Sequence, residues 1–280
     1  MAKLLAEDLQ QFAPGYPFII YTDRPHLFKS STNVLAVKHS CRGVQPYNER
    51  RFAIWHALSI SSSVMYLDAD LRICAPVPQN LDFLPGLTAR SCGSFQKHIQ
   101  EQFHRNPKSS KLKHKKYVIE RMAEHVGIDV NNPELKFINE FLFVVKADEG
   151  RELEFLKIWS ELAIYADTLG MHKHPTYAMS LAAVKSNFPI HRSEMNGLDF
   201  FDDRIEKIKI SKGQVTPEAK AKYFQQQNSI EQGDKNFLKR FFRLFVSKYS
   251  FLYNRTRVQI VSKISPSSLI DYPTLNNSYQ

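Results

Sequence analysis

Cysteine is scarce in this chain, and long apolar runs are absent. Three cysteines, Cys41, Cys74 and Cys92, occur in 280 residues without Cys-x-x-Cys spacing, which indicates neither a zinc site nor a disulfide framework. A reducing, cytoplasmic setting is therefore the simplest expectation. No apolar run approaches the roughly 18 residues that span a bilayer, and the first residues lack the basic-then-apolar pattern of a signal peptide. We expect a protein that is soluble or attached only to a membrane surface.

Hydrophobic residues are numerous enough for a substantial core. They make up 43% of the chain, and this length fits one α/β domain of about 200 residues followed by an appendage. The excess of positive charge begins near residue 204, because residues 204–263 carry 14 Lys and Arg against 4 Asp and Glu. The sequence thus predicts a domain over residues 1–203 and a basic, mostly helical extension over residues 204–280.

The most informative segment is an apolar run that ends in Asp68-Ala69-Asp70. Residues 64–67 follow three serines and are too few for a helix, which predicts a short buried strand. Residues two apart in an extended chain point to the same face, so both carboxylates can converge on one cation. Two carboxylates suit Mg²⁺ or Mn²⁺. The alternative is an ordinary turn in which both aspartates are solvated.

The order of segments around this pair resembles the core of the GT-A glycosyltransferases. A helix expected over residues 47–58 leads into the strand, and residues 17–23 resemble an early strand of that family's nucleotide-binding half. Residues 136–145 resemble the strand that lines the sugar and acceptor pocket, and residues 176–184 the helix that closes it. The resemblance implies an α/β fold of GT-A type, a Rossmann-like mixed sheet flanked by helices.

The resemblance also implies an activity, a glycosyltransferase that moves a sugar from a nucleotide-diphosphate sugar to an unknown glycan, lipid or protein. Mn²⁺ or Mg²⁺ would hold the diphosphate of the donor. The residues implied for binding the donor or the cation are Thr22, Asp23, Arg51, Asp68, Asp70 and, as the best substitute for a third metal ligand, His191. The catalytic residues would be Asp68 and Asp70 with Glu140 as the base of an inverting reaction. The candidate sugar or acceptor contacts are Asn139, His172, His174 and Tyr177.

Departures from the family pattern leave two alternatives open. The chain starts in what resembles the helix after the family's first strand, so either the amino terminus is truncated or that strand is absent. A catalytically inactive sugar- or membrane-binding relative is therefore one alternative. The other is a phosphatase of the haloacid-dehalogenase type, which also places Asp-x-Asp after an apolar strand. Arg72 stands where those enzymes normally have Thr or Val.

Two basic segments have less specific signals. Residues 235–252 have helical spacing, with Phe237, Phe241 and Phe245 on one face and Lys239 and Arg243 opposite, a pattern that is compatible with contact with an anionic membrane surface. The alternative is that the phenylalanines pack on the domain. No nucleic-acid-binding motif accompanies the charge, so we expect no nucleic-acid partner. Residues 108–121 are also rich in lysine and are expected to form either an insertion that attracts an anionic substrate or a solvated loop.

Overall fold

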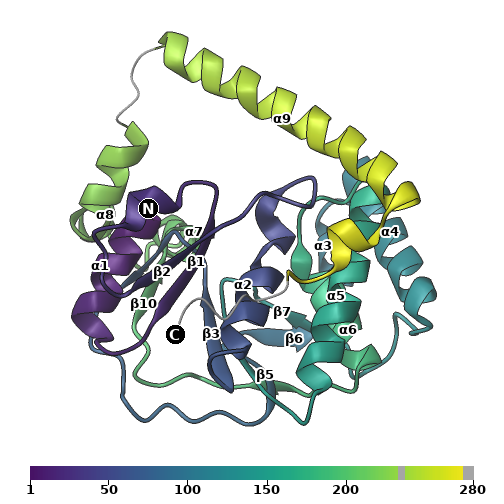
Figure 1. Cartoon of the computed structure of the whole chain (residues 1–280), viewed down its shortest axis with the longest axis horizontal. Helices are drawn as coiled ribbons and strands as arrows, with labels where there is room; N and C mark the ends of the chain where they lie inside the picture. Colours follow the sequence, from purple (N-terminus) through teal and green to yellow (C-terminus); the bar gives the residue numbers. More distant parts are fainter. Residues whose placement is uncertain (233–236, 274–280) are drawn as a thin grey trace. The chain divides into compact units, whose positions relative to one another are not determined.

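The structure is a computed structural model that describes residues 1–232 and 237–273 (Figure 1). The chain divides into two compact units, each built from segments that are distant in the sequence. Unit 1 comprises residues 1–39, 67–81 and 195–250, and unit 2 comprises residues 40–66, 82–194 and 251–280. The charge distribution predicted a single boundary after residue 203. The two compact units do not coincide with that boundary.

Unit 1 contains two small sheets and several helices. The strands β1 (Phe18–Thr22) and β2 (Val34–Lys38) are parallel, whereas β4 (Leu71–Ile73) and β10 (Phe200–Asp202) are antiparallel. The helices are α1 (Ala2–Phe12), the 3-10 turn Pro25–Phe28, α7 (Asp203–Ser211) and α8 (Pro217–Gln232). The long helix α9 (Phe237–Ile264) begins in unit 1 and continues into unit 2.

A buried aspartate on α1 joins this helix to β4. Asp8 accepts hydrogen bonds from Arg72 Nε at 2.7 Å, from Arg72 Nη2 at 2.9 Å and from the backbone N–H of Ile73 at 3.0 Å. Such a two-pronged guanidinium–carboxylate contact fixes orientation as well as charge. The side chain of Arg72 therefore has a structural role, in which it joins α1 to β4 within unit 1.

Unit 2 is built on a mixed four-stranded sheet with the strand order β3-β8-β5-β9. Its strands are β3 (Ser63–Leu67), β8 (Leu142–Lys146), β5 (Gly86–Ala89) and β9 (Ile190–Arg192). Strand β5 is antiparallel to β8 and parallel to β9. A second, antiparallel pair is formed by β6 (Cys92–Ser94) and β7 (Lys136–Ile138). The mixed sheet of an α/β protein is thus confirmed, while the GT-A assignment stays a prediction.

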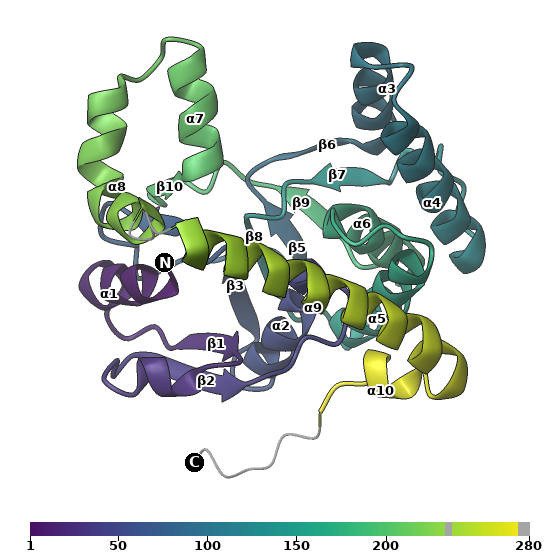
Figure 2. The ribbon, with the colours of Figure 1, turned by 90° about the horizontal axis from the view of Figure 1, so that it is seen from above.

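Helices cover this sheet and supply most of the apolar core of unit 2. They are the 3-10 turn Pro46–Asn48, α2 (Arg50–Leu58), α3 (Phe95–Arg105), α4 (Ser110–Val126), α5 (Arg151–Thr168), α6 (Pro175–Lys185) and α10 (Ser267–Ile270). Helices α5 and α6 lie side by side (Figure 2) and contribute fully buried residues such as Trp159 and Met179. Helix α6 is buried from Pro175 through Ala183, as expected of a helix that is apolar on all sides.

Several predicted elements are confirmed, and two are wrong. The helix before Asp68, the strand over residues 64–67 and the helix over residues 176–184 form as α2, β3 and α6. Residues 136–145 form two strands in different sheets, with a turn at residues 139–141. Residues 108–121 lie mainly in α4, which is a helix because Ser109 caps its start and Gly127, at a φ of 69°, ends it.

The predicted extension is mostly helical, as α7 to α10 show for its described residues. No described helix is both long and apolar enough to cross a lipid bilayer. Of the basic helix predicted over residues 235–252, residues 235 and 236 lie outside the described residues. The side chains of Phe237, Lys239 and Arg243 also lie outside the described part, so the predicted opposition of their faces stays a prediction.

Candidate functional site

Asp68 and Asp70 occupy the turn between β3 and β4, where the chain passes into unit 1. The turn is closed by a hydrogen bond from the Leu71 N–H to the Asp68 carbonyl, 3.0 Å long. Asp68 Oδ2 accepts a hydrogen bond from Arg204 Nη2 at 2.8 Å. Arg204 lies at the start of α7 and donates from the same nitrogen to Asp202 Oδ2 at 2.9 Å. One guanidinium therefore bridges two carboxylates.

Negative charge is concentrated around this turn. The pKa of Asp70 is raised, first by burial and then by the neighbouring carboxylate of Asp68, with a further contribution from Asp202. Arg204 opposes these effects and lowers the pKa. The pKa of Arg204 itself is raised, mainly by its hydrogen bond to Asp202. Arg204 thus contacts two carboxylates, those of Asp68 and Asp202, and Asp70 adds a third negative charge nearby, a balance that attracts a further cation.

The donor atoms of the aspartate pair fit a divalent cation that takes part of its coordination from a substrate. Mg²⁺ is commonly bound by one or two carboxylates together with substrate phosphates. Within residues 1–232 and 237–273, no group of three or more His, Cys, Asp or Glu side chains lies close enough to hold a metal ion. His191 lies on β9 in unit 2, with its Nε2 3.0 Å from the carbonyl oxygen of Pro85. The structure therefore lends no support to His191 as a third ligand.

Asp202 and Arg204 were missed by the reasoning from sequence, which treated Arg204 only as the start of the basic extension. The side chain of Asp202 accepts hydrogen bonds from the backbone N–H groups of Arg204 and Ile205, which caps α7. The available signal was the pair Asp202-Asp203 directly after two phenylalanines, a pattern typical of a strand followed by a helix start.

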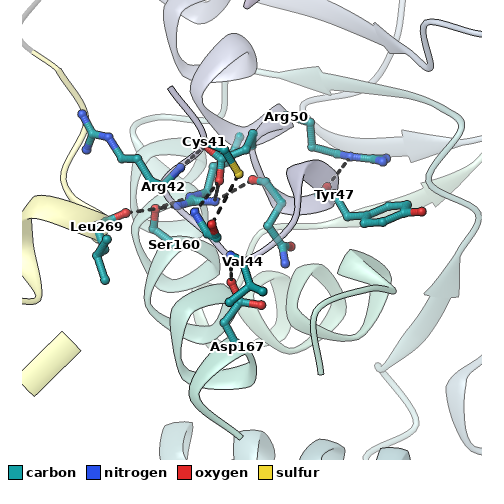
Figure 3. A network of polar contacts seen from close by, with 12 residues as sticks. Cys41, Arg42, Val44, Tyr47, Arg50, Ser160, Asp167 and Leu269 are labelled. Carbon is teal, nitrogen blue, oxygen red and sulfur yellow. Dashed lines mark hydrogen bonds and ion pairs between the residues drawn. The ribbon is translucent and has the colours of Figure 1, made fainter. Parts of the chain in front are cut away.

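Arg51 does not lie where the resemblance implied. Its side chain is fully buried in unit 2, with Nε donating to Ser160 Oγ at 2.7 Å, Nη1 to the Asn48 carbonyl at 2.6 Å and Nη2 to the Leu269 carbonyl at 3.2 Å. Figure 3 shows Ser160 and Leu269 within this network. Since all three of its nitrogens are bonded inside the protein, assigning Arg51 to the donor diphosphate is wrong for this structure.

Thr22 and Asp23 lie at the carboxyl end of β1, in the position that the resemblance implied. The Thr22 Oγ1 accepts a hydrogen bond from the Arg24 N–H at 3.1 Å, and Asp23 forms an exposed ion pair with Arg24 at 3.5 Å. Their contact with a nucleotide stays a prediction.

Asn139 and Glu140 lie in unit 2, in the turn between β7 and β8. Because they lie in a turn and not in a strand, the alternation of side chains along a strand does not set the direction of Glu140. The Asn139 N–H donates to the Ser91 carbonyl at 2.9 Å, and the Glu140 carbonyl accepts from Arg50 Nη1 at 2.6 Å. Both side chains are partly exposed. Their backbone is thus fixed while their side chains reach the surface.

Tyr177 is a core residue. It is 1% exposed, and its ring packs edge-on against Phe95 with 5.5 Å between the centroids. Burial, with the nearby carboxylate of Glu140, raises its pKa to about 12. Its assignment as a sugar or acceptor contact is therefore wrong, because a substrate cannot reach its ring.

His172 and His174, in contrast, line a cavity of unit 2. This cavity has a volume of about 340 Å³, and lysines of α4 form part of its wall. His172 Nδ1 lies 2.9 Å from Asp167 Oδ1. His174 has a φ of 66° and stands immediately before α6. The structure thus brings these two histidines together with part of the basic segment over residues 108–121.

The site residues implied by the resemblance are distributed over both units. Thr22, Asp23, Asp68 and Asp70 belong to unit 1, whereas Arg51, Asn139, Glu140, His172, His174, Tyr177 and His191 belong to unit 2. Neither the protein-family models nor the curated proteins searched give a match to this chain.

Proposed function

We propose that the protein is a metal-dependent glycosyltransferase that uses a nucleotide-diphosphate sugar. The observation that carries the proposal is that Asp68 and Asp202 share the guanidinium of Arg204 directly after a short strand, with the partly buried Asp70 two residues from Asp68. A carboxylate whose pKa is raised by burial and by neighbouring carboxylates is typical of a functional site. A divalent cation would offset the repulsion between Asp70 and those carboxylates.

The residues of unit 1 have distinct roles in this proposal. Asp70 binds the cation directly, and Asp68, which Arg204 orients, supplies a second oxygen or binds the donor's ribose. When bound, the cation supplies Lewis-acid stabilisation of the charge on the departing nucleoside diphosphate. The side chain of Arg204 is 54% exposed, so its remaining N–H groups can donate to diphosphate oxygens. Asp202 holds Arg204 in place.

Glu140 as the base of an inverting reaction and Asn139 as a sugar contact stay predictions, because both residues belong to unit 2. A retaining reaction by front-side displacement needs no such base.

The first test is thermal stability with Mn²⁺ and a panel of nucleoside diphosphates. A ligand at about 100 times its Kd adds roughly 2.7 kcal/mol, which raises the melting temperature by several degrees. We expect one nucleotide to stabilise the wild type only when Mn²⁺ is present, and Asp70→Asn to lose this effect. Asp82→Asn is the matched control, because Asp82 is an exposed aspartate of unit 2. Stabilisation that persists in Asp70→Asn, or no stabilisation by any nucleotide, would contradict the proposal.

Arg204→Gln separates the role of the arginine from that of the metal. Arg204 is the cation that competes with Mn²⁺ for Asp68. Its loss should therefore leave the affinity for Mn²⁺ unchanged or higher, and should lower the affinity for the nucleotide. Weaker binding of Mn²⁺ alone would show instead that Arg204 mainly supports the fold of the turn. The nucleotide that stabilises the protein then names the sugar-nucleotide class to be tested for turnover.

The two alternatives predict different reactions with simple reagents. Release of phosphate from a simple phosphate ester would favour the haloacid-dehalogenase type of phosphatase. Metal-dependent nucleotide binding without turnover of any sugar nucleotide would favour an inactive relative. The position in which phosphatases carry Thr or Val is occupied by Arg72, which binds Asp8, and this argues for the transferase.

A membrane contact is a second proposal, and exposed apolar residues of α9 support it. All described side chains between residues 241 and 250 are exposed, including Phe242 at 70% and Phe245 at 65%. We expect the protein to sediment with vesicles containing phosphatidylserine and not with neutral phosphatidylcholine vesicles. The double variant Phe242→Ser/Phe245→Ser should abolish sedimentation, whereas Leu153→Ser, a similarly exposed leucine on α5, should not. Equal sedimentation of all three proteins would refute the contact.

A further inference from the structure

Basic side chains contribute to the wall of the cavity in unit 2. It opens between the first turns of α4 and the turn that joins α5 to α6. Its wall is formed by Gln45, Lys111, His114, Lys115, Gly170, Met171, His172, Lys173, His174 and Phe251. Three lysines and three histidines thus line a space of about 340 Å³, and no carboxylate is among its lining residues.

The backbone around the cavity is rigidly specified. Gly170 has a φ of 90°, a conformation that favours glycine, and a Cβ added there would lie 3.4 Å from His114 Nε2. Pro175 fixes the first residue of α6 directly after His174. Gly170 and Pro175 therefore restrict the backbone before and after the two histidines.

The carboxylate next to the cavity is already engaged. Asp167 is buried, with one oxygen 2.9 Å from His172 Nδ1 and the other accepting the Val44 N–H at 2.8 Å. It therefore orients the His172 ring rather than neutralising the lysines. Because Nδ1 of His172 lies against Asp167, its other ring nitrogen, Nε2, is not engaged by this carboxylate.

The lysines of the wall lack acidic partners in the described residues. Lys115 Nζ donates to the neutral Gln102 Oε1 at 2.9 Å, and Lys173 Nζ lies 5.8 Å from the centre of the Tyr47 ring. No ion pair is found for Lys111, Lys115 or Lys173 in residues 1–232 and 237–273. Burial lowers the pKa of Lys115. These three lysines are therefore not neutralised by an ion pair within the described part of the chain.

We propose that this cavity binds the phosphate group of a phosphate monoester. Such a group carries a charge of roughly −1.5 to −2 at neutral pH and three strong acceptor oxygens. Ammonium and imidazole N–H groups that come from α4 and from residues 172–174 match that arrangement. The volume lies at the small end of the roughly 300–1,000 Å³ typical of ligand pockets, which suits one small phosphorylated molecule. The binding does not depend on the proposed donor site, because none of Asp68, Asp70, Asp202 and Arg204 lines the cavity.

The test is isothermal titration calorimetry of the full chain with glucose 6-phosphate, with glucose as the uncharged probe, at constant ionic strength. Glucose 6-phosphate should bind and glucose should not. Lys111→Ala and Lys173→Ala should each weaken binding about tenfold or more, as expected for losing a charge-assisted contact. Lys113→Ala is the matched control, since Lys113 lies on α4 but outside the cavity wall, and should change the affinity by less than about twofold.

Additional arms identify the source of the phosphate. Inorganic phosphate tests the group alone, and vesicles containing phosphatidic acid test a lipid that carries the same group. The lipid is the ligand if binding to these vesicles exceeds binding to glucose 6-phosphate and falls in Lys111→Ala but not in Lys113→Ala. Asp70→Asn should retain full binding in every arm, which keeps failure here distinguishable from failure of the donor site.

Three results would overturn the proposal. The first is no binding of any phosphate monoester at concentrations suited to a Kd of about 1 mM. The second is equal weakening by Lys111→Ala and Lys113→Ala, which would indicate only general charge attraction. The third is tighter binding of a single-stranded oligonucleotide than of every monoester. Lys111 and Lys173 are exposed, so their alanine variants should melt within a few degrees of the wild type and report binding rather than folding.

Discussion

Replacement of Arg51 by methionine should destabilise unit 2 strongly without acting on the donor site. Methionine keeps much of the apolar length of the side chain but removes every N–H group. The substitution would leave the Ser160 hydroxyl and the carbonyls of Asn48 and Leu269 without this donor. It would also remove the cation 3.7 Å from the buried carboxylate of Glu49.

The expected loss of unfolding free energy follows from the contacts that Arg51 would lose. Removing one partner from a buried charged network costs about 3–5 kcal/mol, and each buried acceptor left unsatisfied accounts for roughly 1–3 kcal/mol of such a loss. For a folding unit of about 150–250 residues, 1 kcal/mol corresponds to about 2–4 °C. We therefore expect the melting temperature to fall by roughly 6–20 °C.

Tryptophan fluorescence is the appropriate assay, because both tryptophans, Trp55 and Trp159, belong to unit 2. Trp159 Nε1 donates to Asn48 Oδ1 at 3.2 Å, so it reports directly on the surroundings of Arg51. Arg121→Met is the control, since Arg121 pairs with Glu124 on the exposed side of α4, and its loss should leave the melting temperature nearly unchanged. A loss below about 1 kcal/mol in Arg51→Met, together with loss of nucleotide binding, would refute the structural role and restore the role implied by the resemblance.

Three further predictions concern titrating groups. Burial and Asp68 raise the pKa of Asp70 and so disfavour its charged form in the folded state. Asp70→Asn should therefore leave the ligand-free protein as stable as the wild type, or more stable, near pH 7 by differential scanning calorimetry. A clear loss of stability would show that Asp70 has a structural role. Burial, with Lys115 and Lys173, lowers the pKa of His174 from 6.5 to about 4, so its contribution to stability is present above pH 6.5 and is lost as the pH falls toward 4. His174→Gln should therefore flatten the pH dependence of unfolding measured by tryptophan fluorescence in that window, and an unchanged slope would contradict this. Burial, with Glu49, raises the pKa of Cys41 to about 12, so iodoacetamide at pH 8 should label Cys41 slowly in the native protein and rapidly in urea, as mass spectrometry of peptides would show.

The local elements near the aspartate pair were predictable because their signals are local. A short apolar run after three serines identified β3, and the segment order of the resemblance placed a helix over residues 47–58, where α2 forms. Helix α4 was missed because its lysine-rich surface resembles a solvated loop. Its capping residues, Ser109 and Gly127, carried the signal that composition concealed.

The candidate site was less predictable because its contacts are long-range. Arg204 is 136 positions from Asp68 in the chain, and no spacing rule connects them. Tyr177 and Arg51 were assigned to substrates by analogy with a family, yet burial decides their roles, and burial depends on partners such as Phe95 and Ser160 that lie far away in the sequence. Analogy with a family supplied a candidate chemistry. It could not say which side chains reach the surface.

The order in which the two units can be completed during synthesis follows from where their segments lie in the chain. All segments of unit 1 have been made by residue 250, whereas unit 2 still lacks residues 251–273 at that point. Those residues supply the Leu269 carbonyl to Arg51 and the ring of Tyr272, which stacks on Trp55 with 5.2 Å between the centroids. During synthesis, the contacts that Leu269 and Tyr272 make in unit 2 can therefore form only after every segment of unit 1 has been made.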